Sequence, residues 1–482
     1  MNLRSTLRFL GRLLAVLAAA EIFPVFCCLW YGELGAASAF VATGAFTGLV
    51  GWLLIHFGRG GGELYRREGI LIVVGGWVLA SLFGALPYLL TGTIPHPVDA
   101  LFESASGFTT TGASILTDIE AAGRGVLFWR SFTQWLGGMG IIVLFVALLP
   151  ELGPGARFLY QLEVPGPTAE TLHPRVHDTA LVLWRIYLLL SVAEVVLLLL
   201  AGLDLYDAMT HTFSTLSTGG FSPRGASVAA FGSPLVEVIV IVFMLLAGAN
   251  FSLYYAVHLH RGKNLVRDPE FRIYLAITFA AAAVVTWSLM AAGTYDHLPR
   301  AFLDSLFQVV SIGTTTGFAT ADFDLWPNLS RLLLVSLMFL GGCAGSTAGG
   351  MKIMRLVIGL KAAVREVRMI WSPSAVISVF IGGKAVPDTV VRSVAGFLIL
   401  FFSSWGFGSW LLTLGDTDLE TAASAAIACL GNIGPGLHAV GPTANFAFFA
   451  PWQKLVMVLL MWLGRLEVYS IAAVLTFAFW RR

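Results

Sequence analysis

The amino-acid sequence predicts an all-α polytopic membrane protein made of four pseudo-repeats that follow two extra N-terminal transmembrane helices. The first observation behind this fold class is composition. The 482 residues are 57% hydrophobic and 12% charged, whereas a soluble domain carries about 25% charged residues. The second is a series of long apolar segments along the chain, and the third is a set of four short breaks rich in threonine and glycine.

Ten segments are apolar enough to cross a bilayer as helices, which takes about 20 residues each. The first is interpreted as a retained helix, because no clear cleavage site follows it. The eighth contains a glycine-rich interruption and is predicted to form two half-helices. The ten predicted spans are 7–30, 36–57, 69–91, 125–149, 179–202, 234–258, 272–293, 330–362, 388–414 and 452–479.

Charge predicts the orientation of these spans. With ten spans, the arginine and lysine clusters all fall on one side, together with both termini. The positive-inside rule makes that side cytoplasmic, so we expect a protein of the cytoplasmic (inner) membrane. The opposite loops are acidic, which either concentrates cations or is an ordinary property of outer loops. Those acids are Asp99, Glu103, Asp204, Asp207, Asp304, Asp322, Asp324, Asp416, Asp418 and Glu420.

The four breaks repeat one pattern on the outer side. Each follows a semi-apolar stretch of about 11 residues, too short to span and suited to a re-entrant half-helix. The breaks read "SGFTTTGAS", "STLSTGGFS", "SIGTTTGFATADF" and "LGNIGPG". The predicted divisions are two N-terminal helices in 1–62 and four repeats in 63–165, 166–262, 263–372 and 373–482.

The breaks have a chemical purpose that simple turns would not explain. Non-helical backbone at membrane depth is tolerated only inside protein or along a water-filled path. Four rows of backbone carbonyls around one axis replace the water shell of a potassium ion, and glycine permits the dihedral angles that turn them inward. The half-helices also direct their negative carboxyl ends at that axis. The pattern therefore predicts one central pore, with each repeat ordered helix, pore half-helix, filter strand and helix.

Several motifs resemble one known family. They are "REGILIV", "FGALPY", "QWLGGMGIIVL", "RDPEFR", "GGCAGSTAGGMKIMR", "GNIGPG" and "GRLEVY". Together they extend over nearly the whole chain, which is similar to the TrkH-type subunit of the Trk/Ktr/HKT superfamily of potassium transporters. The resemblance implies potassium uptake through a single-chain pore in which each repeat contributes one strand of a selectivity filter.

The resemblance implies filter glycines at Gly112, Gly219, Gly317 and Gly434. Because only one glycine per strand matches tetrameric potassium channels, we expect fewer well-formed ion sites and weaker rejection of sodium. K⁺ is expected to bind at Thr111, Gly112, Thr218, Gly219, Thr316, Gly317, Ile433 and Gly434. The expected filter strands are Thr110–Thr111–Gly112–Ala113, Ser217–Thr218–Gly219–Gly220, Thr315–Thr316–Gly317–Phe318 and Asn432–Ile433–Gly434–Pro435.

The interruption of the eighth span has two interpretations. One is a kinked, closely packed helix, and the other is a loop across the pore below the filter. The resemblance supports the second, because family members carry a gating loop at this position. Its residues are Gly341, Gly342, Gly345, Ser346, Thr347, Gly349 and Gly350.

Two basic residues lie near this interruption. Arg465 falls within an apolar run, and an intramembrane arginine is a functional hypothesis by default. The resemblance places it below the filter near the gating loop, where its charge would repel cations; the alternative is a neutralised pair with Glu467 or another acid. Lys352 is a second gating candidate, or else it extends to the cytoplasmic surface.

The chain itself is expected to hold no cofactor other than the transported K⁺. The resemblance implies a homodimer regulated by a cytosolic nucleotide-binding ring of the TrkA type, and a basic face is either its docking site or a contact for anionic lipid. That face comprises Arg355, Lys361, Arg365 and Arg368. His211 and His438 are assigned no role.

Other classes fit the sequence less well. The rivals are a poorly selective K⁺/Na⁺ pore of the same fold and an ion-coupled solute carrier, although carriers show inverted repeats. Enzyme motifs are absent from the sequence, the four cysteines show no zinc spacing, and the net charge of +1 does not indicate nucleic-acid binding.

Overall fold

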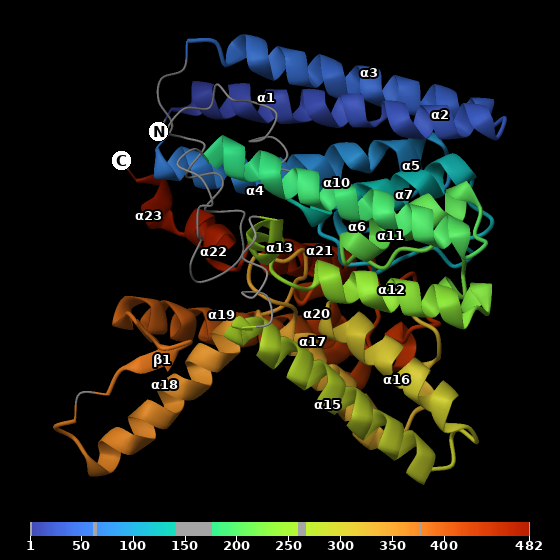
Figure 1. Cartoon of the computed structure of the whole chain (residues 1–482). Coiled ribbons are helices and arrows are strands. Elements are labelled where there is room, and N and C mark those ends of the chain that lie inside the picture. The colour runs from blue at the N-terminus through green and yellow to red at the C-terminus, as the bar shows by residue number, and fades with distance from the viewer. Residues whose placement is uncertain (1, 61–64, 141–175, 259–266, 376, 482) are drawn as a thin grey trace.

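The structure is a computed structural model that describes residues 2–60, 65–140, 176–258, 267–375 and 377–481. The described residues are nearly all helical, as the sequence predicts (Figure 1). The strands among them form one antiparallel hairpin, β1 (Val379–Ile381) with β2 (Lys384–Val386). The fold is therefore the predicted all-α membrane architecture with a small hairpin added.

Long apolar helices confirm the membrane class. In the described part of the chain, six helical segments are long and apolar enough to cross a bilayer: Leu3–Trp30, Leu34–Phe57, Arg67–Leu90, Ala180–Leu200, Pro269–Ala291 and Asp388–Thr413. A seventh candidate is the pair Pro451–Arg465 and Tyr469–Leu475, which is bent by 119° at its break. The first segment consists of α1 (Leu3–Ala20) and α2 (Ile22–Trp30), and the second is α3 (Leu34–Phe57). These three helices pack together along one edge of the molecule (Figure 1).

Each of the four repeats contains a long helix, a short helix, an extended strand and a second helix. Repeat 1 holds α4 (Arg66–Gly84) with α5 (Leu86–Leu90), α6 (Pro97–Phe108) and α7 (Arg124–Gly138). Repeat 2 holds α10 (Val176–Leu200), α11 (Leu205–Leu216) and α12 (Pro234–Ala247). Repeat 3 holds α15 (Pro269–Ala291), α16 (Leu298–Gly313) and α17 (Asn328–Leu340), and repeat 4 holds α19 (Asp388–Thr413), α20 (Leu419–Leu430) and α21 (Pro451–Arg465).

The short helices α6, α11, α16 and α20 are the predicted half-helices, and they form the core. Every residue of α6 from Phe102 to Phe108 is buried, as is every residue of α20 from Ser424 to Leu430. Short 3₁₀ turns follow the strands of repeats 2, 3 and 4: η2 (Ser227–Phe231), η3 (Phe323–Leu325) and η4 (His438–Val440). The core is therefore built around the ends of the half-helices, where the four breaks begin.

The structure corrects three predicted continuous spans. The segment 234–258 is broken between α12 and α13 (Phe251–His258), and 452–479 is broken between α21, α22 (Tyr469–Leu475) and α23 (Phe477–Trp480). The predicted span 125–149 loses its helix after Gly138, and its part from 141 onward lies outside the described residues. At the first of these breaks, the freed carbonyl of Gly248 accepts from Cys343 N, and Phe251 N donates to Gly345 O. Such long-range partners for broken backbone leave no local sequence signal.

The predicted interruption in 330–362 is confirmed as a loop. α17 ends at Leu340 and α18 (Ile353–Trp371) begins after twelve non-helical residues, 341–352, which we call the glycine-rich loop. The kinked-helix interpretation is therefore wrong. α18 diverges from the other helices and carries the β-hairpin at its side (Figure 1).

Candidate ion pathway

The four breaks begin with the same backbone hydrogen bonds. In each repeat, one N–H donates a hydrogen bond to the carbonyl three residues earlier: Thr110 to Gly107, Thr218 to Thr215, Thr315 to Ile312 and Asn432 to Cys429. The next N–H returns five residues: Thr111 to Ser106, Gly219 to Ser214, Thr316 to Ser311 and Ile433 to Ala428, at 2.8–2.9 Å. Because both bonds recur in all four repeats, they define which residues are equivalent.

Backbone angles repeat in the same register. The first residue of each strand has a positive φ: 55° at Thr110, 54° at Thr218, 60° at Thr315 and 54° at Asn432. Two residues later a glycine again has a positive φ: 81° at Gly112, 77° at Gly220, 85° at Gly317 and 98° at Gly434. Left-handed angles are costly for residues with a side chain, so four matched pairs make these strands the candidate functional backbone.

The four strands close into a ring. A Cβ added to Gly112 would overlap the carbonyl oxygen of Gly219 in the next strand. The same relation links Gly220 to Thr316 O, Gly317 to Ile433 O and Gly434 to Thr111 O. The chain of contacts therefore runs from strand 1 through 2, 3 and 4 and returns to strand 1. Four equivalent carbonyls, those of Thr111, Gly219, Thr316 and Ile433, are brought together by this closure.

The structure corrects the predicted register of strand 2. The equivalent of Gly112, Gly317 and Gly434 is Gly220, not Gly219, and the strand runs from Thr218 to Phe221 rather than from Ser217 to Gly220. Repeat 2 has two adjacent glycines, so the sequence offers two alignments. The backbone decides between them because only Gly220 has the positive φ. The other three strands keep the predicted boundaries.

Two cavities lie on opposite sides of the ring. A cavity of about 280 Å³ is lined by all four glycines and by residues that follow them, such as Ser222 and Ala319. A smaller cavity of about 60 Å³ is lined by the glycine-rich loop, Lys352, Arg465 and the end of α7. The loop contacts residues that precede the glycines, because Gly349 N donates to Thr315 Oγ1 at 2.7 Å. We call these the outer and the inner cavity.

Several of the acids that the sequence predicts in the outer loops form ion pairs with basic side chains. Glu103 pairs with Arg130 at 2.6 Å, Asp207 with Arg224 at 2.6 Å, Asp304 with Arg300 at 2.7 Å and Asp99 with Lys454 at 2.7 Å. The basic partners occur singly in the sequence and were not predicted as outer residues. Pairing reduces the net field of these acids, so the described ion pairs favour a structural role for them over the concentration of cations.

The outer parts of strands 1 to 3 are attached to their half-helices by buried polar side chains. The Glu103 carboxylate accepts from Ser114 Oγ and from Ile115 N, both at 2.9 Å. His211 Nε2 lies 3.0 Å from Ser222 Oγ, and the Gln308 amide faces Thr320 and Ala321. Glu103, His211 and Gln308 are each eight residues before the ring carbonyls of their strands. His211, to which the sequence assigned no role, is thus part of this shared support.

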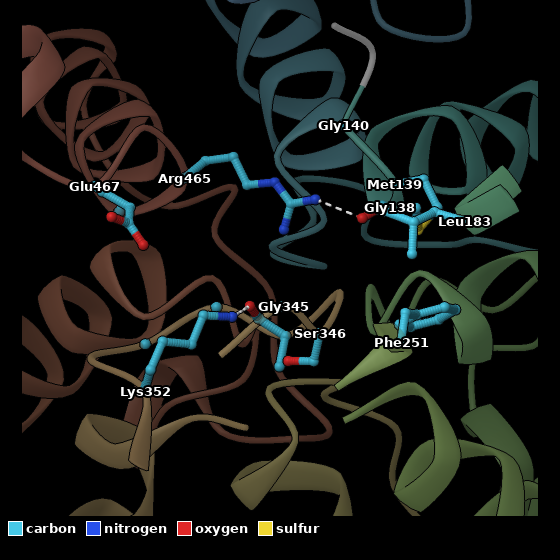
Figure 2. Close-up of a pocket in the computed structure, with 14 residues that line it drawn as sticks. Gly138, Met139, Gly140, Leu183, Phe251, Gly345, Ser346, Lys352, Arg465 and Glu467 are labelled. Atoms are coloured by element: carbon cyan, nitrogen blue, oxygen red, sulfur yellow. Dashed lines mark hydrogen bonds between the residues drawn. The ribbon is translucent and has the colours of Figure 1, made fainter. Parts of the chain in front are cut away.

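Arg465 connects the glycine-rich loop to repeat 1 across the inner cavity (Figure 2). Its Nη1 donates to Thr347 O at 2.9 Å, and its Nη2 donates to Gly138 O at 2.8 Å and also to Gly137 O. Glu467, the suggested acid partner, instead has its carboxylate 2.5 Å from Arg355 Nη2. The guanidinium fork of Arg465 therefore binds backbone carbonyls on both sides of the cavity.

Lys352 lies on the other side of the inner cavity (Figure 2). Only 2% of the residue is exposed, and its Nζ donates to Ala348 O within the loop. The expectation that Lys352 extends to the cytoplasmic surface is therefore wrong. Two basic side chains, Arg465 and Lys352, therefore line one small cavity on the inner side of the ring.

The predicted basic face of α18 is only partly exposed. Arg355 is 5% exposed, pairs with Glu467 and lies over the Phe397 ring at 4.1 Å. It does not belong to a docking face, because α19 and the end of α21 cover it. Lys361 contacts Phe380 O, and Arg365 contacts Asp388.

Comparisons with known proteins agree with this geometry. The model of the TrkH family, described as "Cation transport protein", matches residues 36–479. The chain is 39% identical to the "Trk system potassium uptake protein TrkH" of Halomonas elongata and 37% identical to that of Escherichia coli K12, with 100% of each chain covered. It also matches the crystal structure of the potassium transporter TrkH from Vibrio parahaemolyticus, with a TM-score of 0.89 and 37% identity over 100% of both chains.

The fold and the ring of four strands define a membrane transport protein and not an enzyme. With a family match over most of its length, the chain belongs to the TrkH family of cation transport proteins.

Proposed function

We propose that this protein takes up potassium across the cytoplasmic membrane through the axis enclosed by its four strands. The observation that carries the proposal is the closed ring in which each filter glycine faces a carbonyl of the next strand. Backbone carbonyls that converge on one axis replace the hydration shell of K⁺. The relatives are named potassium uptake proteins, which supports the same ion.

The corrected register gives the proposed K⁺ ligands. They are the carbonyl-bearing residues Thr111, Gly112, Gly219, Gly220, Thr316, Gly317, Ile433 and Gly434. Thr218, which the sequence suggested as a ligand, is equivalent to Thr110. It is the first residue of strand 2 and is therefore not in the ligand set. The carboxyl ends of the four half-helices lead into the ring, and their partial negative charge further stabilises a cation there.

The inner cavity supports a gate. A cation that leaves the ring on the inner side would meet the glycine-rich loop, Arg465 and Lys352 in a cavity of about 60 Å³. Fixed positive charge in a narrow, low-dielectric space opposes cation passage far more than it does in water. We therefore assign the closed state to the Arg465 bonds that hold the loop to α7.

Opening the gate needs a conformational input. Both ends of the loop are continuous with α17 and α18, so a displacement of α18 would pull the loop from the ring. Arg368, together with Lys361 and Arg365, gives α18 a basic surface that suits a cytosolic nucleotide-binding ring of the TrkA type. A second copy of the chain would complete the homodimer implied by the family resemblance, with lipid around the remaining apolar surface.

Flux measurements on the purified full-length chain test the proposal. The protein is reconstituted into proteoliposomes, and an inward rubidium gradient is imposed across their membrane. Uptake of radioactive rubidium is then measured at increasing external concentrations of K⁺ or Na⁺. We expect K⁺ to compete at much lower concentration than Na⁺. Equal competition by both ions would favour the poorly selective pore, and uptake that saturates only with an organic solute present would overturn the proposal.

A further inference from the structure

Strand 2 differs from the other three strands at one ring position. Thr111, Thr316 and Ile433 carry side chains there, whereas repeat 2 has Gly219. The two threonine side chains turn back onto the residue that precedes their own strand. Thr111 Oγ1 lies 2.8 Å from Thr109 Oγ1, and Thr316 Oγ1 lies 2.8 Å from Thr314 Oγ1. Strand 2 has no side chain at this position to hold it in the same way.

Gln134 of α7 occupies the missing side chain's place. A Cβ added to Gly219 would overlap the Cδ, Oε1 and Nε2 atoms of Gln134. The amide donates from Nε2 to Gly219 O at 2.6 Å and accepts from Phe221 N at Oε1 at 3.0 Å. It therefore spans Gly220, the filter glycine of this strand, with one hydrogen bond on each side.

The orientation of this amide follows from donor chemistry. Oxygen and nitrogen of a glutamine amide are assigned from the hydrogen-bond network. The Phe221 N–H can only donate, so the atom that faces it must be Oε1. Nε2 must then face Gly219 O, which can only accept. Gln134 is fully buried, so both hydrogen bonds are shielded from water.

A polar residue at this place is specific to repeat 1. The second helices of the other repeats each bury a methionine fully within four residues of their ends: Met244 in α12, Met338 in α17 and Met461 in α21. Burying a glutamine costs free energy unless both ends of its amide are bonded. A methionine at position 134 would satisfy hydrophobic packing alone. The amide of Gln134 is therefore explained by its hydrogen bonds to strand 2.

We infer that Gln134 is a positioning residue that sets the geometry of strand 2 and thereby contributes to cation selectivity. The inference rests on the proposed filter. Gly219 O is one of the four equivalent carbonyls of the ring, and the Gln134 bond fixes its direction and reduces its negative charge. Gln134 thus makes the ring unequal, because one ligand is held by a side chain of another repeat. K⁺ discrimination depends on this ligand being correctly placed.

Rubidium uptake in proteoliposomes, with Na⁺ competition, tests this inference on the full-length chain. Gln134→Met copies the other repeats and removes both hydrogen bonds. We expect the preference for Rb⁺ over Na⁺ to fall by about two- to tenfold, the range that one neutral hydrogen bond supports. A role in packing alone would lower the yield or both fluxes together and leave the preference unchanged.

Gln134→Glu adds a readout that packing cannot produce. A protonated carboxyl can donate to Gly219 O and accept from Phe221 N, whereas a carboxylate can only accept. We therefore expect the ion preference of this variant to fall as the pH rises, while that of the native protein does not follow this trend. A variant whose preference is native at every pH would overturn the inference.

A double variant tests whether the side chain at position 134 substitutes for the one missing at position 219. Gly219→Thr alone should block uptake, because its side chain meets Gln134. Combining it with Gln134→Ala gives strand 2 the residue of strands 1 and 3 and the space to hold it, so uptake and preference should recover. If the double variant recovers neither uptake nor ion preference, the inference is overturned. The same holds if the double variant does not insert into the membrane.

Gly317→Ala in the same assay distinguishes a failure of the proposed filter from a failure of the role of Gln134. If Gly317→Ala alters ion preference and the Gln134 variants do not, the filter stands and the role of Gln134 fails. If neither alters it, the filter assignment itself fails. Thermal melting of each preparation shows that the compared proteins are folded.

Discussion

The four strands of the proposed filter and the glycine-rich loop differ in how far the repeats share their geometry. The strands repeat the same two hydrogen bonds and the same pair of positive φ angles in all four repeats. The loop between α17 and α18 occurs in repeat 3, and it bonds to repeat 1 through Arg465, to α12 through Cys343 and to strand 3 through Gly349. A ring around one axis takes one strand from each of the four repeats, whereas closing a path needs only one obstruction.

The largest expected effect is on ion preference, when one of the four equivalent strands is altered. Gly317→Ala places a Cβ against Ile433 O and forces a side chain onto a φ of 85°. We expect the preference for K⁺ over Na⁺ to be largely lost in competition assays. Gly313→Ala is the matched control, because it lies four residues earlier in α16 with no atom near its added Cβ. Equal behaviour of the two variants would contradict the filter assignment.

The next effect concerns the link across the inner cavity. Arg465→Ala removes the bonds to Thr347 O and Gly138 O. A hydrogen bond from a charged donor contributes about 1.5–3 kcal/mol, so losing one shifts a closed–open equilibrium by about tenfold or more. Flux should rise while ion preference stays native. Arg465→Lys is the control that keeps the charge but not the fork, and a destabilised Arg465→Ala protein with no gain in flux would instead indicate a structural role.

A smaller effect is expected where the loop meets the ring. Gly349→Ala would put a Cβ against Gly431 O at the end of α20, which displaces the loop from its contact with the ring. We expect flux to rise severalfold, less than for Arg465→Ala, because the arginine bonds remain. Liposome flux measures the change, and reduced flux in folded protein would show that the loop does not obstruct the path.

The smallest effect is expected at the outer rim. Arg331 pairs with Asp324 and Glu420, and the Glu420 side chain is 47% exposed. Exposed ion pairs contribute about 0–1 kcal/mol, so Glu420→Gln should change neither the melting temperature beyond a small shift nor ion preference. A marked loss of K⁺ uptake in this variant would restore the view that rim acids concentrate cations.

The predictable parts of the site depend on local sequence. The half-helices α6, α11, α16 and α20 were predicted from short semi-apolar stretches before a Thr/Gly break, and three strands kept their predicted register. Strand 2 did not, because two adjacent glycines fit the pattern equally well. The break after α12 was missed because it lies in an apolar run whose freed backbone groups find partners far away in sequence. The break after α21 was missed because its backbone turns through local hydrogen bonds inside a long, mostly apolar segment.

The sequence by itself determined the membrane class, the four Thr/Gly breaks and the glycine-rich interruption of the eighth span, because hydropathy and glycine content act within a few residues. Tertiary structure decided that this interruption is a loop and that Lys352 is buried beside it. Tertiary structure alone decided that Gly220 is the equivalent of Gly112, Gly317 and Gly434 in strand 2, that Arg130 pairs with Glu103, and that Gln134 bonds Gly219 across 85 residues of sequence. These three features depend on contacts between residues that are distant in sequence and come together only when the four repeats close into a ring. No local sequence pattern specifies such contacts.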